Sequence, residues 1–213
     1  MIQIIPTILT ADVSDFEKKL HLVENHVDRV QIDYVDGYFA PEMSCCEAHI
    51  IREVDTNVAL EVQLMVVDPL KQVKAWANSG VERIIGHIEE MEDQVAFVER
   101  VGEFGLSVGL ALNLETSIKK LNLSLLPSLD VILLMAHQVG IQGGLALNDV
   151  VYNKIQELKT LEPDIDIEID GGVNADNAKK LIDAGATILA VGSAVFAAKD
   201  PVQALQELKE IVT

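Results

Sequence analysis

The sequence has few cysteines, no long hydrophobic run and no targeting signal at its start. Its two cysteines, Cys45 and Cys46, are adjacent, and neighbouring residues do not easily reach disulfide geometry. They also lack the C-x-x-C spacing of a redox or metal pair, so we expect free thiols in a reducing compartment. No apolar stretch approaches the roughly 20 residues that span a bilayer. These absences predict a cytoplasmic protein without a membrane partner.

Basic residues are also scarce. The chain has 16 Lys and Arg against 34 Asp and Glu, a net charge of −18. Such a charge repels polyanions, which excludes nucleic acid and anionic lipid as main partners. A small phosphorylated ligand remains compatible with it, because a few backbone amides can hold one phosphate group.

The length and composition are those of one globular unit. The chain has 213 residues, of which 49% are hydrophobic and 23% charged, and it shows no linker or low-complexity segment. We therefore expect a single domain over residues 1–213, near the lower size of one α/β barrel.

Short aliphatic runs alternate with amphipathic helical stretches along the whole chain. The eight predicted strands cover residues 3–9, 29–33, 59–65, 83–87, 106–112, 131–136, 166–170 and 187–191. Continuous apolar runs such as residues 131–134 must be covered on both faces, as in a parallel sheet. Because no glycine-rich fingerprint follows the first strand, we predict an α/β fold of the (β/α)8 TIM-barrel type with an eight-stranded parallel sheet, not a doubly wound sheet.

Several residues predict where helices begin and end. Ser14 is expected to cap the first helix with Glu17 reaching back to it, and Asn174 is expected to open a helix over residues 175–183. Gly185 is expected to end that helix. The last helix should begin at Pro201.

Polar residues end otherwise apolar strands, and in an eight-stranded barrel such ends converge on the active site. They are Thr7, Gln31, Asp33, Gln63, His87, His137, Asp170, Gly192 and Ser193. Because Gln31 and Asp33 are two residues apart, they should face the same side of their strand. Glu61 and Gln63 should form the corresponding inward pair on the next strand.

Two of these residues suit proton transfer. Asp33 and Asp170 are placed to act as base and acid on the two faces of one carbon. If they are close together in a dry pocket, repulsion between them should raise one pKa. An aspartate at a strand end can instead be a helix cap or a turn former.

Glycine-rich turns follow the last two strands. Loops at these positions of a barrel commonly bind phosphate through backbone N–H groups. The candidate phosphate ligands are therefore Gly171, Gly172, Gly192 and Ser193, and the loop after strand six could add donors from Gly140, Gly143 and Gly144. Taken alone, the glycines of either turn could serve only the turn geometry and bind no phosphate. His87 and His137 could contact a ligand or be structural, and Met65 and Met135 could pack in the core or form a pocket wall.

Several short segments follow one another in a fixed order along the chain: PTILTAD at 6–12, DYVDGYFAP at 33–41, LMV at 64–66, EIDGGVN at 168–174 and GSAVF at 192–196. Together they resemble the ribulose-phosphate 3-epimerase family. The resemblance covers essentially the whole chain. It implies a (β/α)8 barrel that interconverts ribulose 5-phosphate and xylulose 5-phosphate by moving the C3 proton from one face to the other.

The resemblance also implies roles for individual residues. Asp33 and Asp170 match the acid/base aspartates and Thr7 a hydroxyl residue near the substrate. Met65 and Met135 match pocket methionines. Gly171, Gly172, Gly192 and Ser193 match the family's phosphate-binding residues.

The chain departs from the family pattern at the metal site. The family holds a divalent ion, such as Zn, Fe or Mn, with two aspartates and two histidines, and here those histidine positions are Gln31 and Gln63. An amide oxygen is a poor ligand for zinc or iron compared with imidazole, so we predict no metal cofactor. We expect the amide NH2 groups of both glutamines, with His137, to stabilise the enediolate instead.

Departures elsewhere bear on the sugar contacts. The loop after strand six reads QVGIQGG at 138–144 where the family reads NPGFGGQ, and Tyr38 and Glu42 stand where the family has His and Asn. The leading prediction is a metal-independent phosphosugar 3-epimerase. The alternatives are an epimerase or isomerase of another ketose phosphate, and a phosphosugar-binding barrel that has lost catalysis. A homo-oligomer is possible. The Asp-x-Lys-x-x-Asp motif of related decarboxylases and synthases is absent from the 33–36 region.

Overall fold

The computed structural model describes residues 2–141, 143 and 145–213. Its parallel strands close into one barrel in chain order, with β1 beside β8. The strands are β1 (Gln3–Ile8), β2 (Arg29–Val35), β3 (Ala59–Met65), β4 (Arg83–His87), β5 (Ser107–Leu112), β6 (Val131–Met135), β7 (Asp166–Asp170) and β8 (Ile188–Val191). The predicted (β/α)8 fold is confirmed, and only β2 departs from its predicted bounds by more than one residue, since it continues past Asp33 to Val35.

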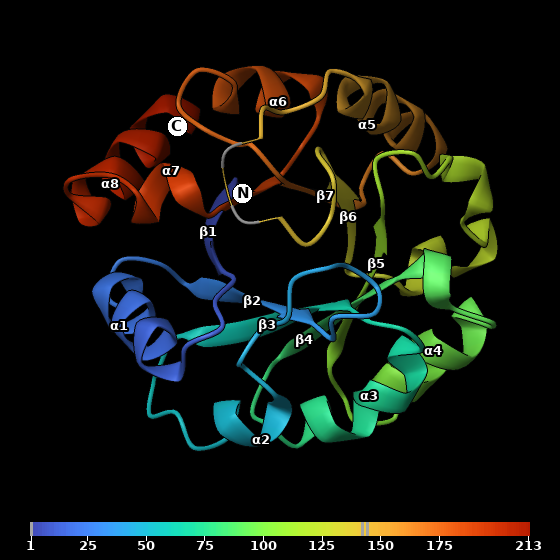
Figure 1. The fold of residues 1–213 in the computed structure, drawn as a ribbon. Helices are drawn as coiled ribbons and strands as arrows, with labels where there is room; N and C mark the ends of the chain where they lie inside the picture. The colour runs from blue at the N-terminus through green and yellow to red at the C-terminus, as the bar shows by residue number, and fades with distance from the viewer. Residues whose placement is uncertain (1, 142, 144) are drawn as a thin grey trace.

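Helices form a ring around the barrel (Figure 1). They are α1 (Val13–Val23), α2 (Ala48–Ile51), α3 (Pro69–Ala77), α4 (Gln94–Gly102), α5 (Val150–Leu161), α6 (Ala178–Ala184), α7 (Ser193–Phe196) and α8 (Pro201–Val212). The described ranges also contain the 3-10 helices η1 (Ile88–Glu90), η2 (Ile118–Lys120) and η3 (Leu123–Ser128). Between β5 and β6, η2 and η3 take the place of an α-helix.

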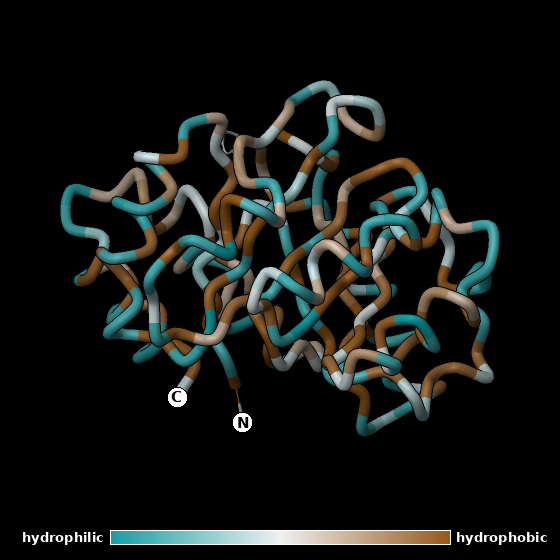
Figure 2. The backbone as a smooth tube through the Cα atoms, turned by 90° about the horizontal axis from the view of Figure 1, so that it is seen from below, coloured by the Kyte–Doolittle hydropathy of each residue, from teal (hydrophilic) through white to brown (hydrophobic). Residues whose placement is uncertain are grey.

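The main core lies between the barrel and the helices. Phe16, Trp76 and Phe97 are fully buried there, packed against the outward side chains of the strands. Every residue of β6 is buried, as a strand covered on both faces requires. Figure 2 shows the resulting alternation of hydrophobic and hydrophilic segments along the chain.

Two predicted helix starts were wrong. Asp12, not Ser14, caps α1, and its carboxylate accepts the Asp15 N–H at 3.0 Å. Asn174 does not open α6, because its side chain accepts the Asp176 N–H at 2.9 Å within a turn and the helix begins only after Asn177. At α1 the Asp12 side chain takes the backbone donor, and before α6 the Asn174 side chain forms a local turn instead of a helix cap. The predicted end of α6 at Gly185 and the predicted start of α8 at Pro201 are confirmed.

A layer of charged side chains fills the barrel below the pocket. Glu61 accepts a hydrogen bond from Arg83 Nε at 2.7 Å, and the Arg83 Nη2 atom lies 3.6 Å from Glu168 Oε2. All three residues are buried. Arg29 Nε lies 3.7 Å from the same Glu61 oxygen, Oε2, that accepts from Arg83. The floor of the pocket therefore rests on an ionic layer.

Two further predictions concern the cysteines and membrane-spanning helices. Cys45 and Cys46 are free thiols, as predicted. Within the described ranges, no helix is both long and apolar enough to cross a membrane.

Candidate active site

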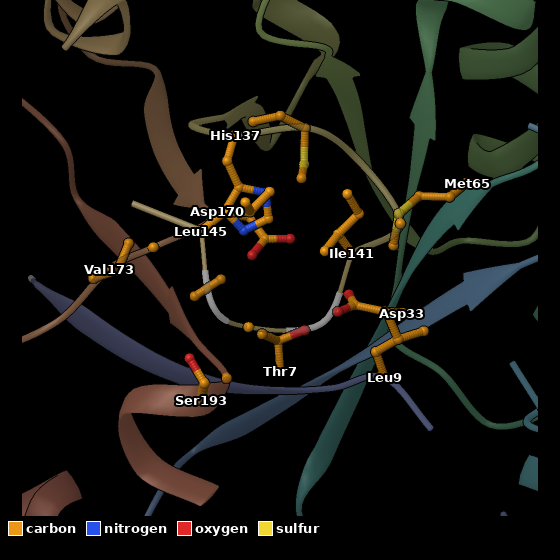
Figure 3. Close-up of a pocket in the computed structure, with 17 residues that line it drawn as sticks. Thr7, Leu9, Asp33, Met65, His137, Ile141, Leu145, Asp170, Val173 and Ser193 are labelled. Atoms are coloured by element: carbon orange, nitrogen blue, oxygen red, sulfur yellow. The ribbon is translucent and has the colours of Figure 1, made fainter. Parts of the chain in front are cut away.

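A pocket opens at the carboxyl ends of the strands, where the sequence analysis placed the chemistry (Figure 3). Its walls come from loops and strand ends of both halves of the barrel. Thr7, Leu9, Asp33, Met65, Met135, His137, Gly140, Ile141, Gly143, Leu145, Asp170, Gly171, Gly172, Val173, Ala190, Gly192 and Ser193 line it. Of the predicted site residues, Gln31, Gln63 and His87 lie outside this lining, and Gly144 lies outside the described residues.

The pocket brings Asp33 and Asp170 together from opposite halves of the chain. Asp33 extends from β2 and Asp170 ends β7, and the two residues are only 6% and 7% exposed. One amide nitrogen, Gln31 Nε2, donates to Asp33 Oδ1 at 2.8 Å and to Asp170 Oδ2 at 3.3 Å. A shared donor places the two carboxyl groups within one small cluster. Neither group is used as a helix cap.

The environment separates the proton affinities of the two aspartates. Burial raises the pKa of Asp33 to about 6, against hydrogen bonds from Thr7 and Gln31 that lower it. Burial raises the pKa of Asp170 well above its ordinary value, and the charge of Asp33 raises it further. Burial and repulsion therefore favour the proton on Asp170 over Asp33. This is the state that a base and acid pair needs.

Replacing Asp33 should stabilise the fold, and more so at alkaline pH. The pKa of Asp33 is raised from 3.8 to about 6 on folding, so the stability tied to its neutral form is present below the unfolded-state pKa and is lost as pH rises through 6. A shift of this size corresponds to at most about 3 kcal/mol. We expect the gain in unfolding free energy of Asp33→Asn to be larger at pH 8 than at pH 4.5 in urea titrations. An equal difference at the two pH values would contradict this.

Gln31 and Gln63 form the floor beneath the carboxyl groups. Both are fully buried. Besides the aspartates, Gln31 Nε2 donates to Thr7 Oγ1 at 3.0 Å. Strand register explains the cluster, because Thr7 pairs with Gln31 and Asp33 pairs with Gln63. The NH2 group of Gln31 thus faces carboxylates in this structure, and direct donation from the two amides to a substrate oxygen stays a prediction.

The residues of this cluster do not fit the divalent ion that the sequence resemblance implies. N–H hydrogens of Gln31 point between Asp33 and Asp170, where a cation held by both carboxylates would have to sit, and like partial charges repel. Within residues 2–141, 143 and 145–213, no group of three or more His, Cys, Asp and Glu is arranged to hold a metal. The amide oxygens that remain are poor ligands for zinc or iron.

Three glycine-containing loops meet at the wall opposite Asp33. Gly172 has φ +68°, and a Cβ there would lie 2.5 Å from the Leu147 backbone nitrogen, so only glycine fits. Gly143 approaches the start of α7 so closely that its Cβ would lie 3.2 Å from Ser193 Cβ. The loops after β6, β7 and β8 therefore close around one corner of the pocket, beside the N-terminus of α7.

Sequence reasoning missed the apolar part of the lining. Leu9, Ile141, Leu145, Val173 and Ala190 face the pocket (Figure 3 labels four of them). The only signal for Leu9, Val173 and Ala190 in the sequence is their position close to polar strand ends, and Ile141 and Leu145 have none. Met65 and Met135, predicted as a wall or as core, do line the pocket while being 2% exposed each.

Comparison with known proteins decides the family. The model of the ribulose-phosphate 3 epimerase family matches residues 3–196. The chain belongs to this family. The Bacillus subtilis ribulose-phosphate 3-epimerase is 31% identical over 98% of this chain and 99% of its own length. The Chlamydia pneumoniae ribulose-phosphate 3-epimerase is 34% identical over 91% of this chain and 87% of its own. Family membership places the chain among the isomerases that act on carbohydrates.

More distant solved structures share the fold. KGPDC from Streptococcus mutans superposes with a TM-score of 0.77 at 12% identity, covering 100% of this chain and 97% of that chain. A 3-hexulose-6-phosphate synthase has a TM-score of 0.74 at 15% identity and covers both chains fully. At such identities the likeness concerns the barrel alone.

Proposed function

We propose that this member of the ribulose-phosphate 3-epimerase family interconverts ribulose 5-phosphate and xylulose 5-phosphate without a bound divalent metal. The observation that carries the proposal is the buried Asp33 and Asp170 pair, joined by one amide donor at 2.8 and 3.3 Å. Its curated relatives carry the name of this activity.

Epimerisation at C3 requires a base on one face of the carbon and an acid on the other. Asp33, ionised above pH 6, takes the C3 proton, and the electron pair moves toward the C2 carbonyl to form an enediolate. Protonated Asp170 then donates its proton to C3 from the opposite face, which inverts the centre. The reverse reaction uses the same groups with exchanged roles.

In this chain, an amide N–H donor holds the two carboxyl groups in place. Gln31 bonds both of them and Thr7. Fixed donors cost no reorganisation during the reaction. His137 lines the pocket, and its Nδ1 lies 2.7 Å from the Gln138 carbonyl oxygen. With Nδ1–H donated there, Nε2 can donate to a substrate oxygen only when the ring is an imidazolium.

The glycine corner is the proposed phosphate site. Gly171, Gly172, Gly192 and Ser193 all line the pocket, and Gly192 caps α7. Backbone N–H groups at the start of a helix have no partners within the helix and attract anions. The overall charge of −18 is then no obstacle, because the contact is local.

A second candidate is the epimerisation of a different ketose phosphate. The observation that favours it is the apolar loop after β6, whose Ile141 and Leu145 line the pocket. A loop of this kind offers fewer polar contacts to sugar hydroxyls than one built from polar side chains, which changes the sugar that fits best.

Proton NMR in D2O tests the proposal. Protein treated with chelator and analysed for metals is incubated with ribulose 5-phosphate while the C3–H signal and xylulose 5-phosphate are followed. We expect exchange and product at undiminished rate. The matched variant Gln31→His/Gln63→His restores the family's ligand set and should gain Mn or Zn binding that the parent lacks.

The possible outcomes separate the alternatives. Activity that disappears with chelator and returns with Mn would overturn metal independence. Exchange with another ketose phosphate but not with ribulose 5-phosphate would establish the second candidate. Binding of the sugar phosphates with no exchange in any of them would show a barrel that has lost catalysis.

A further inference from the structure

A histidine lies directly behind the active-site glutamines. His87 ends β4, is fully buried, and its Nε2 atom is 2.9 Å from the end of the Gln63 amide. The Phe39 ring packs against it with centroids 5.0 Å apart. His87 does not line the pocket, so it can act on the substrate only through Gln63.

Glu89 fixes the imidazole from its other side. Glu89 Oε2 lies 3.3 Å from His87 Nδ1, and Glu89 Oε1 accepts the Asn113 N–H at 2.8 Å. Burial acts to raise the pKa of Glu89, but the hydrogen bond and charge of His87 prevail and lower it to about 2. The ionised carboxylate therefore accepts the Nδ1–H, so that His87 Nε2 can also donate only when the ring is an imidazolium paired with Glu89. The Asn113 carbonyl is itself bonded by Lys154 Nζ at 2.7 Å.

The Gln63 amide has two possible orientations. With its carbonyl toward His87, its NH2 group donates to Asp170 Oδ2 at 2.8 Å and Asp33 Oδ1 at 3.2 Å, and the carbonyl accepts from His87 Nε2 at 2.9 Å. With the amide reversed, its oxygen accepts from Gln31 at 3.1 Å but faces those same carboxylate oxygens. A hydrogen bond to an ionised carboxylate such as Asp33 is about twice as strong as a neutral one, and the first orientation also keeps the Gln63 oxygen away from both acidic side chains. It is therefore favoured even though the two amide nitrogens then approach each other.

We propose that His87, as an imidazolium paired with Glu89, is a positioning residue that holds the Gln63 amide with its NH2 group toward Asp33 and Asp170. This rests on the proposed proton transfer between the aspartates. The His87 and Glu89 pair determines whether the NH2 group or the oxygen of Gln63 faces Asp33 and Asp170. Without it, the amide can turn its oxygen toward the carboxylates and misplace them.

The test compares two replacements of His87. His87→Leu removes the donor, whereas His87→Gln can place an N–H near the position of Nε2. We expect kcat for epimerisation to fall at least tenfold in His87→Leu with KM changed less than threefold, and to recover to within threefold of the parent in His87→Gln. Ile84→Val, a buried outward-facing position on the same strand, controls for loss of packing and should leave kcat unchanged.

NMR of the Gln63 side chain gives a readout independent of turnover. In protein with 15N-labelled glutamine, the Gln63 NH2 signals are assigned by their loss in Gln63→Leu. We expect deshielded, slowly exchanging protons in the parent and in His87→Gln, and displaced, faster-exchanging signals in folded His87→Leu.

Each arm can overturn the proposal. Folded His87→Leu with kcat within twofold of the parent, His87→Gln as slow as His87→Leu, or Gln63 signals unchanged by His87→Leu would each refute it. If the parent itself turns over no ketose phosphate, the proposed function has failed, and the NMR arm still decides whether His87 positions Gln63.

Discussion

Asp33→Asn is expected to lower kcat for epimerisation by ~10³-fold, because general acid and base groups typically contribute about 10²–10⁴-fold. Asn has the size of Asp but cannot accept the C3 proton. Asp170→Asn should have a comparable effect, since it cannot return a proton from the other face. Stopped assays of xylulose 5-phosphate formation and solvent deuterium incorporation at C3 would measure both.

The pH profile of the parent gives an independent check on the same pair. Activity should rise with pH through about 6, where Asp33 ionises, and fall again at higher pH as Asp170 loses its proton, a bell shape that belongs to the coupled pair. Asp166→Asn makes the same chemical change at a partly exposed position of β7 and should leave the rate unchanged. A rate loss below tenfold in Asp33→Asn would show that another group is the base.

Arg83→Met is expected to destabilise the fold by about 3–5 kcal/mol, the usual cost of leaving a buried charge without its partner. Arg83 donates to Glu61 and lies 3.6 Å from Glu168, and both glutamates are fully buried. Neither Glu168 side-chain oxygen has a hydrogen-bond partner within the described part of the chain. Urea unfolding monitored by Trp76 fluorescence would measure the loss.

Two controls make that prediction specific. Arg100→Met breaks an exposed pair with Glu103 and should cost at most about 1 kcal/mol. The double variant Glu61→Gln/Arg83→Met removes both charges and should cost less than the sum of the single variants. Strict additivity, or a small effect of Arg83→Met alone, would mean that the layer contributes little to stability.

The strands were predictable because their signal is local. Apolar runs such as residues 131–134 need cover on both faces whatever their neighbours are, and the observed β6 is buried throughout. Helix caps were less predictable. Asp12 and Ser14 both suit a cap by residue type, and only the backbone path selects the Asp12 carboxylate.

The candidate site likewise has features that the sequence predicts and features that it does not. The alternation of side chains along a strand predicted that Gln31 and Asp33 share a face, and the hydrogen bond between them agrees. The position of His87 behind Gln63 was not predictable, because strand ends cannot be ranked by depth from the sequence. Nor did any local pattern indicate that Ile141 and Leu145 face the pocket.

The sequence by itself determined the eightfold repeat, the family and the two aspartates, because strand periodicity and short motifs are properties of neighbouring residues. The tertiary structure alone decided what surrounds those aspartates. Barrel closure pairs β1 with β8, so that β2 beside β1 and β7 beside β8 come close together. This arrangement buries Asp33 and Asp170 around the Gln31 amide. Burial and mutual repulsion then separate their pKa values. Such proximity depends on residues more than a hundred positions apart, so it exists only once the chain has folded.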